Sequence, residues 1–146
     1  HIGHRAILAN AATLGGHVKV ADYATVGAFS GVHQFCRVGA YAFIGGYSVI
    51  TRDALPFIKT VGDRNKARIY GINSLGLRRM DFSSQRITTL KEAYRILFQK
   101  GFKIQEAVEK IRQRGLDNAD VNIILRFIET SERGCVKNSE RNIHKK

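Results

Sequence analysis

Aliphatic side chains recur at every sixth position through the first third of the chain. They occupy nine consecutive repeat positions: Ile2, Leu8, Leu14, Val20, Val26, Val32, Val38, Ile44 and Ile50. A helix repeats at about 3.6 residues and a strand at about 2, so a period of six fits neither. It fits one side of a prism-shaped parallel β-helix, in which each aliphatic residue stacks on its equivalent in the next coil. Small residues and glycines recur between them, and we expect the glycines to permit the turns.

Apolar residues return at helical spacing in the second half, over residues 87–98, 104–111 and 121–128. Residues that can cap a helix precede the first and third segments: Ser83 or Ser84, and Asp117 or Asn118. A glycine follows each segment and is expected to end it: Gly101, Gly115 and Gly134. We therefore predict three helices that pack on one another and on the end of the prism, followed by a frayed polar tail over 135–146.

Charge divides the chain at the same place as the apolar pattern. The net charge is +12, yet residues 1–55 hold only four of the 24 basic residues. Pro56 is the only proline and marks the boundary. We predict a repeat β-helix over 1–55, and a linker and three-helix domain with a basic tail over 56–146. A strongly basic chain attracts polyanions: nucleic acid, anionic lipid or an acidic protein.

The remaining composition is that of an ordinary globular chain. Two cysteines, Cys36 and Cys135, are too few for a disulfide framework and suggest a reducing compartment. No apolar run is long enough to cross a bilayer. The first residue already falls inside a repeat, so we expect the sequence to be an N-terminally truncated fragment.

Three segments resemble one family of hexapeptide-repeat enzymes. They are Ile-Leu-Ala-Asn at 7–10 with Ala-Thr-Leu-Gly-Gly-His-Val at 12–18, Val-His-Gln-Phe-Cys at 32–36, and Tyr-Gly-Ile-Asn at 70–73 with Gly-Leu-Arg-Arg at 76–79. Together they resemble the acyl-[acyl-carrier-protein]–UDP-N-acetylglucosamine O-acyltransferases, which catalyse the first step of lipid A synthesis. The resemblance covers the whole chain. It implies a left-handed parallel β-helix of hexapeptide repeats followed by a small C-terminal α-helical domain.

The resemblance also implies a reaction. In that family a homotrimer forms active sites between neighbouring prisms. A histidine removes the proton of the sugar 3-hydroxyl, which attacks the thioester of a 3-hydroxyacyl chain on acyl carrier protein, and a backbone N–H stabilises the oxyanion. The implied partners are acyl carrier protein, UDP-N-acetylglucosamine and further copies of the chain. No cofactor, nucleic acid or stable membrane insertion is implied, and the expected location is the cytoplasm of a Gram-negative bacterium.

The family's functional residues carry over to particular positions of this chain. Gly16 matches the glycine that donates the oxyanion N–H, and Gly46 matches the position that sets acyl length, where glycine would admit a long chain. Substrate-binding roles fall on His17, His33, Gln34, Asn73, Arg78 and Arg79. His33 also breaks a local rule, because the equivalent position in the other repeats is glycine, alanine or threonine.

The general-base histidine is the point at which the match departs from the family. A gap-free alignment through Arg5 and Ile7 places the family's His-x-x-His segment upstream of His1. Pairing His4 with the base would require deletion of a full hexad, which would move it to another face of the prism than His17. We therefore expect the general base upstream of His1, with His4 as the lesser alternative.

The sequence alone leaves several alternative functions open. A related lipid A N-acyltransferase and a coenzyme A-dependent acetyltransferase share the prism. A trimeric zinc hydratase would need three converging histidines, and a non-catalytic fragment would need no site. Leu75 stands where some family members have a polar nucleotide contact, so the choice between a hydroxyl and an amine acceptor is also open. A β-sandwich with fortuitous spacing is disfavoured by nine repeats in register.

Overall fold

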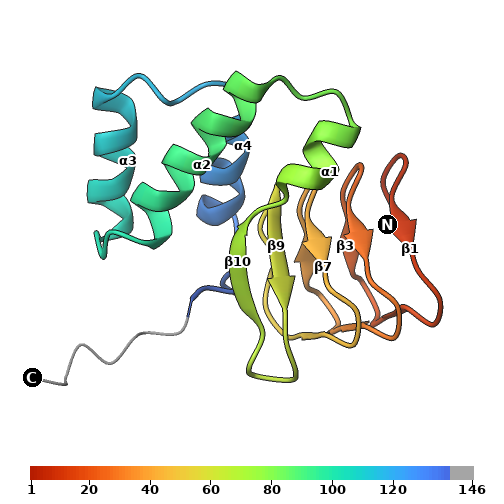
Figure 1. The fold of residues 1–146 in the computed structure, drawn as a ribbon. Helices are drawn as coiled ribbons and strands as arrows, with labels where there is room; N and C mark the ends of the chain where they lie inside the picture. The colour runs from red at the N-terminus through yellow and green to blue at the C-terminus, as the bar shows by residue number, and fades with distance from the viewer. Residues whose placement is uncertain (139–146) are drawn as a thin grey trace, which may run out of the picture.

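The computed structural model describes residues 1–138 and shows short parallel strands stacked in three sheets (Figure 1). The first sheet has the order β1-β4-β7 and continues with β9 (Ile58–Val61) and β10 (Arg68–Ile72), the second has the order β2-β5-β8 and the third β3-β6. The strands of the coils are β1 (Ile7–Leu8), β2 (Thr13–Leu14), β3 (Lys19–Val20), β4 (Thr25–Val26), β5 (Gly31–Val32), β6 (Arg37–Val38), β7 (Phe43–Ile44) and β8 (Val49–Ile50). Ile7 pairs with Thr25 and Thr13 with Gly31, so three hexads complete one coil. The predicted parallel β-helix followed by helices is confirmed.

The repeated aliphatic side chains form the core of the prism. Val20, Val26, Val32, Val38, Ile44 and Ile50 are each no more than 3% exposed. Each stacks on the residue one coil away through the strand register, as the period of six predicts. Ile2 and Leu8 remain 46% and 41% exposed, because they stand at the end of the stack where no described coil covers them.

The glycines that follow the aliphatic residues serve close packing of the coils. We expected them to permit the turns, but Gly15, Gly27 and Gly39 do not have a positive φ. A Cβ at these three positions would lie 2.5–2.6 Å from backbone atoms of the next coil. Any side chain would therefore force neighbouring coils apart. The expectation of turn glycines was wrong, and the reason is the short distance between stacked turns.

The turns are made by residues with side chains in the left-handed region. Eight residues six positions apart have φ between 51° and 64°: Arg5, Ala11, His17, Tyr23, Phe29, Phe35, Tyr41 and Tyr47. They form three corners, which we name the Tyr41 corner (Arg5, Tyr23, Tyr41), the Tyr47 corner (Ala11, Phe29, Tyr47) and the His17 corner (His17, Phe35). Rings stack along each corner at centroid distances of 4.8–5.2 Å. Stacking offsets part of the strain of a left-handed backbone.

The first sheet continues past the predicted boundary at Pro56. β9 (Ile58–Val61) pairs in parallel with β7, and β10 (Arg68–Ile72) returns antiparallel to β9. The segment that the sequence suggested as a linker is therefore a hairpin. Its inner residues Ile58, Ile69 and Ile72 join Leu55 and Phe57 in a second core, which the helices cover.

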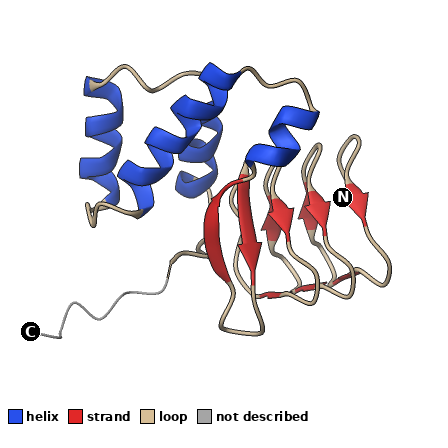
Figure 2. Ribbon diagram, in the orientation of Figure 1, coloured by secondary structure: helices blue, strands red, loops and turns tan. Residues whose placement is uncertain are grey.

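Four helices follow the hairpin (Figure 2). They are α1 (Ser74–Arg79), α2 (Ser84–Phe98), α3 (Ile104–Gln113) and α4 (Ala119–Glu129). Ser83 caps α2 by accepting from the Arg86 N–H at 3.2 Å, and Asn118 caps α4 by accepting from the Val121 N–H at 2.9 Å. Helices α2, α3 and α4 and both caps were predicted, whereas the short helix α1 was not. The helices lie at the end of the prism away from β1 (Figure 1).

The segment after α4 differs from the frayed tail that was predicted. Cys135 and Val136 are each 6% exposed, and Cys135 forms a parallel bridge with Asp53. Cys135 and Val136 thus extend the third sheet by one strand position, and this pairing holds them in place. The rest of the predicted tail, residues 139–146, lies outside the described residues.

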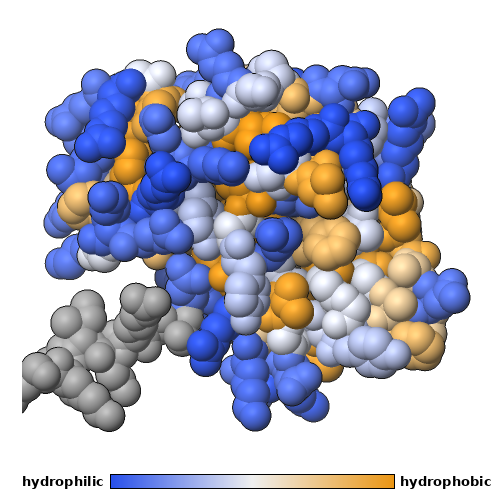
Figure 3. All heavy atoms as spheres, viewed as in Figure 1, coloured by the Kyte–Doolittle hydropathy of each residue, from blue (hydrophilic) through white to orange (hydrophobic). Residues whose placement is uncertain are grey.

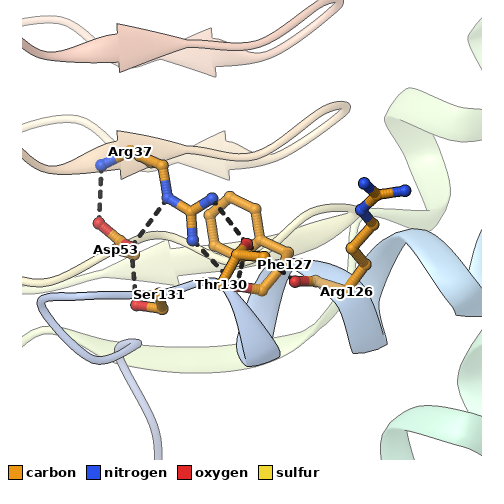
Figure 4. A network of polar contacts seen from close by, with 6 residues as sticks. All are labelled: Arg37, Asp53, Arg126, Phe127, Thr130 and Ser131. Carbon is orange, nitrogen blue, oxygen red and sulfur yellow. Dashed lines mark hydrogen bonds and ion pairs between the residues drawn. The ribbon is translucent and has the colours of Figure 1, made fainter.

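Arg37 joins the last coil to α4 (Figure 4). Its Nε donates to Asp53 Oδ2 at 3.2 Å, its Nη1 to Thr130 Oγ1 at 3.1 Å and its Nη2 to the Phe127 carbonyl at 2.9 Å. The guanidinium also lies over the Phe127 ring, 4.2 Å from its centroid. Asp53 accepts from the Ser131 hydroxyl at 2.7 Å, so one buried carboxylate binds both domains.

On the face seen in Figure 3, surface hydropathy differs between the helices and the prism. Strongly hydrophilic side chains gather over the helices, and paler and apolar side chains cover more of the prism (Figure 3). Among residues 1–138, no helix combines the length and apolar character needed to cross a membrane.

Candidate active site

A groove of about 410 Å³ follows the second sheet toward the His17 corner. Its floor is formed by residues of three successive coils, and its lining includes three residues singled out from the sequence: Gly16, His33 and Gln34. Thr13, Thr51 and Arg64 add polar groups to the walls. The regular 18-residue repeat brings residues 16 and 33–34 together, because they are one coil apart.

Gly16 presents an unoccupied backbone donor in this groove. Its carbonyl accepts from the Phe35 N–H at 3.0 Å, but no described residue accepts a hydrogen bond from its own N–H. A Cβ built on Gly16 would meet nothing within 4 Å, in contrast to neighbouring Gly15, which lies against Gln34. An open, fixed N–H is what an oxyanion requires of a donor.

His33 is half-buried and is held through one ring nitrogen. Its Nδ1 lies 3.1 Å from the Gln34 carbonyl and 3.4 Å from Nη2 of Arg133. No hydrogen bond joins Nε2 to any residue that the structure describes. Gln34 is exposed beside it, so the Nε2 of His33 and the side-chain amide of Gln34 have no hydrogen-bond partner among the described residues.

His17 stands at the edge of the groove. It is exposed, and its ring stacks on Phe35 with centroids 4.8 Å apart and an interplanar angle of 1°. The stack fixes the plane of the imidazole while leaving its nitrogens open to solvent. This neighbour of Gly16 therefore presents an exposed imidazole next to the groove.

The other candidate residues lie elsewhere on this copy of the chain. Asn73 is 7% exposed, caps α1 by accepting from the Gly76 N–H at 3.3 Å, and donates to the Tyr41 carbonyl at 3.4 Å. Arg78 and Arg79 are exposed in the last turn of α1. All three belong to the Tyr41 corner side. Gly46 precedes Tyr47 at the far edge of the second sheet and does not line the groove.

His4 does not approach His17. It is exposed on the Tyr41 corner, where its backbone N–H donates to Asp22 Oδ1 at 2.6 Å and its carbonyl accepts from Tyr23. The two histidines precede different sheets, so a single substrate in the groove of one chain would not contact both.

Sequence reasoning missed two arginines of the site. Arg64 lines the groove from the β9–β10 turn, and Arg133, in the segment after α4, lies 3.4 Å from the groove residue His33. Arg133 also faces the buried Cys36; burial raises the pKa of that thiol, and the guanidinium opposes the effect. Neither arginine belongs to a repeat, so no periodic signal could have revealed it.

No three His, Cys, Asp or Glu side chains within residues 1–138 are grouped as metal ligands would be. The zinc hydratase alternative required three converging histidines, and one copy of the described chain does not supply them.

Comparison with known families decides the relationship of the chain. The sequence profile described as UDP N-acetylglucosamine O-acyltransferase, domain 2, matches residues 53–136, which is more than half of the 146 residues. The chain belongs to this family. The profile match includes the hairpin, all four helices and the segment that carries Arg133.

Similarity to individual O-acyltransferases extends over the prism as well. An acyl-[acyl-carrier-protein]–UDP-N-acetylglucosamine O-acyltransferase of Syntrophobacter fumaroxidans is 46% identical over 136 residues, which cover 93% of this chain and 52% of that relative. The solved UDP-N-acetylglucosamine acyltransferase of Arabidopsis superposes with a TM-score of 0.85 at 34% identity, and that of Francisella novicida with 0.83 at 34%. They cover 94% and 92% of this chain, and 50% and 49% of those structures. The chain thus spans about half the length of the curated O-acyltransferases it matches.

Proposed function

We propose that this protein transfers a 3-hydroxyacyl chain from acyl carrier protein to the 3-hydroxyl of UDP-N-acetylglucosamine. The observation that carries the proposal is the groove lined by Gly16, whose N–H has no described partner, together with His33 and Gln34, in a chain that belongs to the O-acyltransferase family. The curated relatives are named for this acyl donor and this acceptor.

The groove offers chemistry suited to acyl transfer. A thioester is already activated, so the reaction needs a base for the hydroxyl and a donor for the oxygen that becomes negative. The N–H of Gly16 is the proposed oxyanion donor. His17, His33 and Gln34 are the proposed contacts to the sugar nucleotide, because their polar atoms lie in or at the edge of the same groove.

A histidine general base completes the proposed reaction. His4 is a poor candidate because it lies on a different corner from His17 and its backbone is held by Asp22. We place the base upstream of His1, where the gap-free alignment through Arg5 and Ile7 puts the family's His-x-x-His segment.

A homotrimer accounts for the candidate residues that lie far from the groove. Arg78, Arg79 and Asn73 occupy the Tyr41 corner side, whereas the groove opens toward the His17 corner. Packing three prisms side by side would bring the first region of one copy to the groove of the next. The same arrangement would also cover the exposed rings of Phe29 and Phe35, which are 57% and 54% exposed.

The basic helical domain is the proposed docking site for acyl carrier protein. The chain carries a net charge of +12, mostly after Pro56, and complementary charge raises the rate of encounter with an acidic partner. We also propose that the protein acts in the cytoplasm, where the reducing conditions suit its two free cysteines.

Acyl transfer by the full-length protein tests the proposal directly. We expect product from a 3-hydroxyacyl carrier protein and UDP-N-acetylglucosamine. A Gly16→Pro variant removes the backbone donor and also restricts the backbone at residues 15 and 16. It should lower kcat by about 100-fold or more, and thermal unfolding checks that the prism is intact. Absence of transfer, together with turnover of an acyl coenzyme A instead, would favour the acetyltransferase alternative and refute the proposal. Transfer only to a 3-amino acceptor would correct the substrate.

A further inference from the structure

The segment after α4 is fixed to the prism on both sides of Arg133. On one side, the Ser131 hydroxyl donates to Asp53 Oδ2 at 2.7 Å. On the other, the Asp53 N–H donates to the Gly134 carbonyl at 2.8 Å, and the Val136 N–H donates to the Asp53 carbonyl at 2.9 Å. Asp53 is 1% exposed and is itself bound by Arg37, so the anchor is rigid (Figure 4).

This anchor holds the Arg133 side chain over the turn from His33 to Cys36. Its Nη2 lies 3.4 Å from Nδ1 of His33. The positive charge of the guanidinium also acts on the fully buried Cys36 thiol, where it opposes the rise in pKa that burial causes. The contact with His33 places the guanidinium beside the groove, although 100 residues of sequence separate Arg133 from His33.

The chemistry of guanidinium decides which nitrogen of His33 carries the proton. An arginine only donates hydrogen bonds, so Nδ1 can meet Arg133 only with its lone pair. The other neighbour of Nδ1 is the Gln34 carbonyl at 3.1 Å, which only accepts and would require a proton on Nδ1. The two contacts therefore demand opposite tautomers, and the charged donor is the stronger partner.

We propose that Arg133 is a positioning residue for His33: it occupies Nδ1 and thereby makes the imidazole a neutral donor that presents Nε2–H to a substrate oxygen. The described residues that line the groove include no carboxylate that would pair with a charged imidazole. The substrate part of this inference rests on the proposed acyl transfer. Through Arg133, the C-terminal domain would contribute to the candidate active site on the prism.

Nitrogen NMR of the full-length protein with labelled histidines tests the tautomer. The His33 signals are assigned by their loss in a His33→Gln variant. We expect the wild-type ring to show the Nε2–H form at neutral pH. In an Arg133→Met variant the Nδ1–H form should rise to a substantial fraction, because the Gln34 carbonyl becomes the remaining partner. Arg133→Lys should restore part of the original tautomer.

Arg114→Met provides the matched control, since Arg114 is an exposed arginine at the end of α3. It should leave the His33 signals unchanged. Wild-type protein with the Nδ1–H form, or an Arg133→Met spectrum identical to that of wild type, would overturn the proposal.

Steady-state kinetics test the consequence for the substrate. We expect Arg133→Met to lower kcat/KM for the sugar nucleotide by roughly 3- to 10-fold, mainly through KM, because one hydrogen bond loses its orientation. Arg114→Met should leave KM for the sugar nucleotide unchanged. A shifted tautomer with unchanged kinetics would refute the role in substrate binding. If the wild-type enzyme shows no acyl transfer, the proposed function fails, while the NMR result still decides whether Arg133 sets the tautomer.

Discussion

Replacement of Asp53 by alanine should destabilise the protein by about 3 kcal/mol. The carboxylate accepts three hydrogen bonds: from the Arg37 N–H at 2.7 Å, from Arg37 Nε at 3.2 Å and from the Ser131 hydroxyl at 2.7 Å. Each bond to a buried charge contributes about 1.5–3 kcal/mol, but the sum must be reduced because water can replace one partner. The Arg37 side chain is 26% exposed, so its guanidinium recovers part of the loss.

Asparagine at the same position should be nearly as harmful as alanine. Its amide oxygen can replace Oδ1 and accept from the Arg37 N–H. The amino group of the asparagine then takes the place of Oδ2 and faces Arg37 Nε. Both groups are donors, so the hydrogen bond that Oδ2 accepts in the wild type is lost. The similar cost of the two variants would separate hydrogen-bond chemistry from simple loss of volume.

Urea unfolding followed by circular dichroism measures the effect in the full-length protein. Asp120→Ala is a suitable comparison, because Asp120 also binds an arginine bidentately, at 2.8 and 2.9 Å from Arg86. The Arg86 side chain is 47% exposed, so this variant should lose only about 1 kcal/mol. The reasoning would be refuted if Asp53→Ala unfolded within about 0.5 kcal/mol of wild type, or if Asp120→Ala cost more.

Three further predictions concern packing, acyl length and pH. Gly27→Ala should lose about 3 kcal/mol in urea unfolding, because its Cβ would lie 2.6 Å from backbone atoms, whereas Gly31→Ala, with nothing within 4 Å, should change stability by less than about 0.5 kcal/mol. If acyl transfer is confirmed, Gly46→Met should shift preference toward shorter 3-hydroxyacyl donors by at least about tenfold in a competition assay, and equal use of all lengths would contradict the assignment. Burial raises the pKa of the Cys36 and Cys135 thiols above 9.0, so the unfolded chain releases these protons first and the free energy of unfolding should fall as pH rises above about 9; alanine at both positions should flatten that decline.

The regular parts of the molecule could be predicted because the signal repeats. Val20 and Ile44 are fully buried at positions that the period of six assigns to the core, and each repeat adds the same information. Ser83 and Asn118 could be predicted as caps because capping depends on neighbours within three residues. Gly16 and His33 could be placed near one another once the coil length was known.

The parts that could not be predicted depend on single contacts between distant residues. Two examples are the bridge between Asp53 and Cys135 and the contact between His33 and Arg133. Each contact forms only once, so no repeated pattern along the chain predicts it. The rings at the corners are a different case. They recur every six residues from His17 to Tyr47, and this second period was a signal available in the sequence.

The pairing of Asp53 with the segment after α4 also constrains when the protein can finish folding during synthesis. Asp53 leaves the ribosome long before Gly134, yet its N–H and carbonyl find their partners only in residues 134–136. Until those residues emerge, the last coil exposes unpaired polar groups and the carboxylate lacks Ser131. The nascent prism is therefore complete only after the entire helical domain has been translated, and a ribosome stalled within α4 would hold a chain with an open sheet edge.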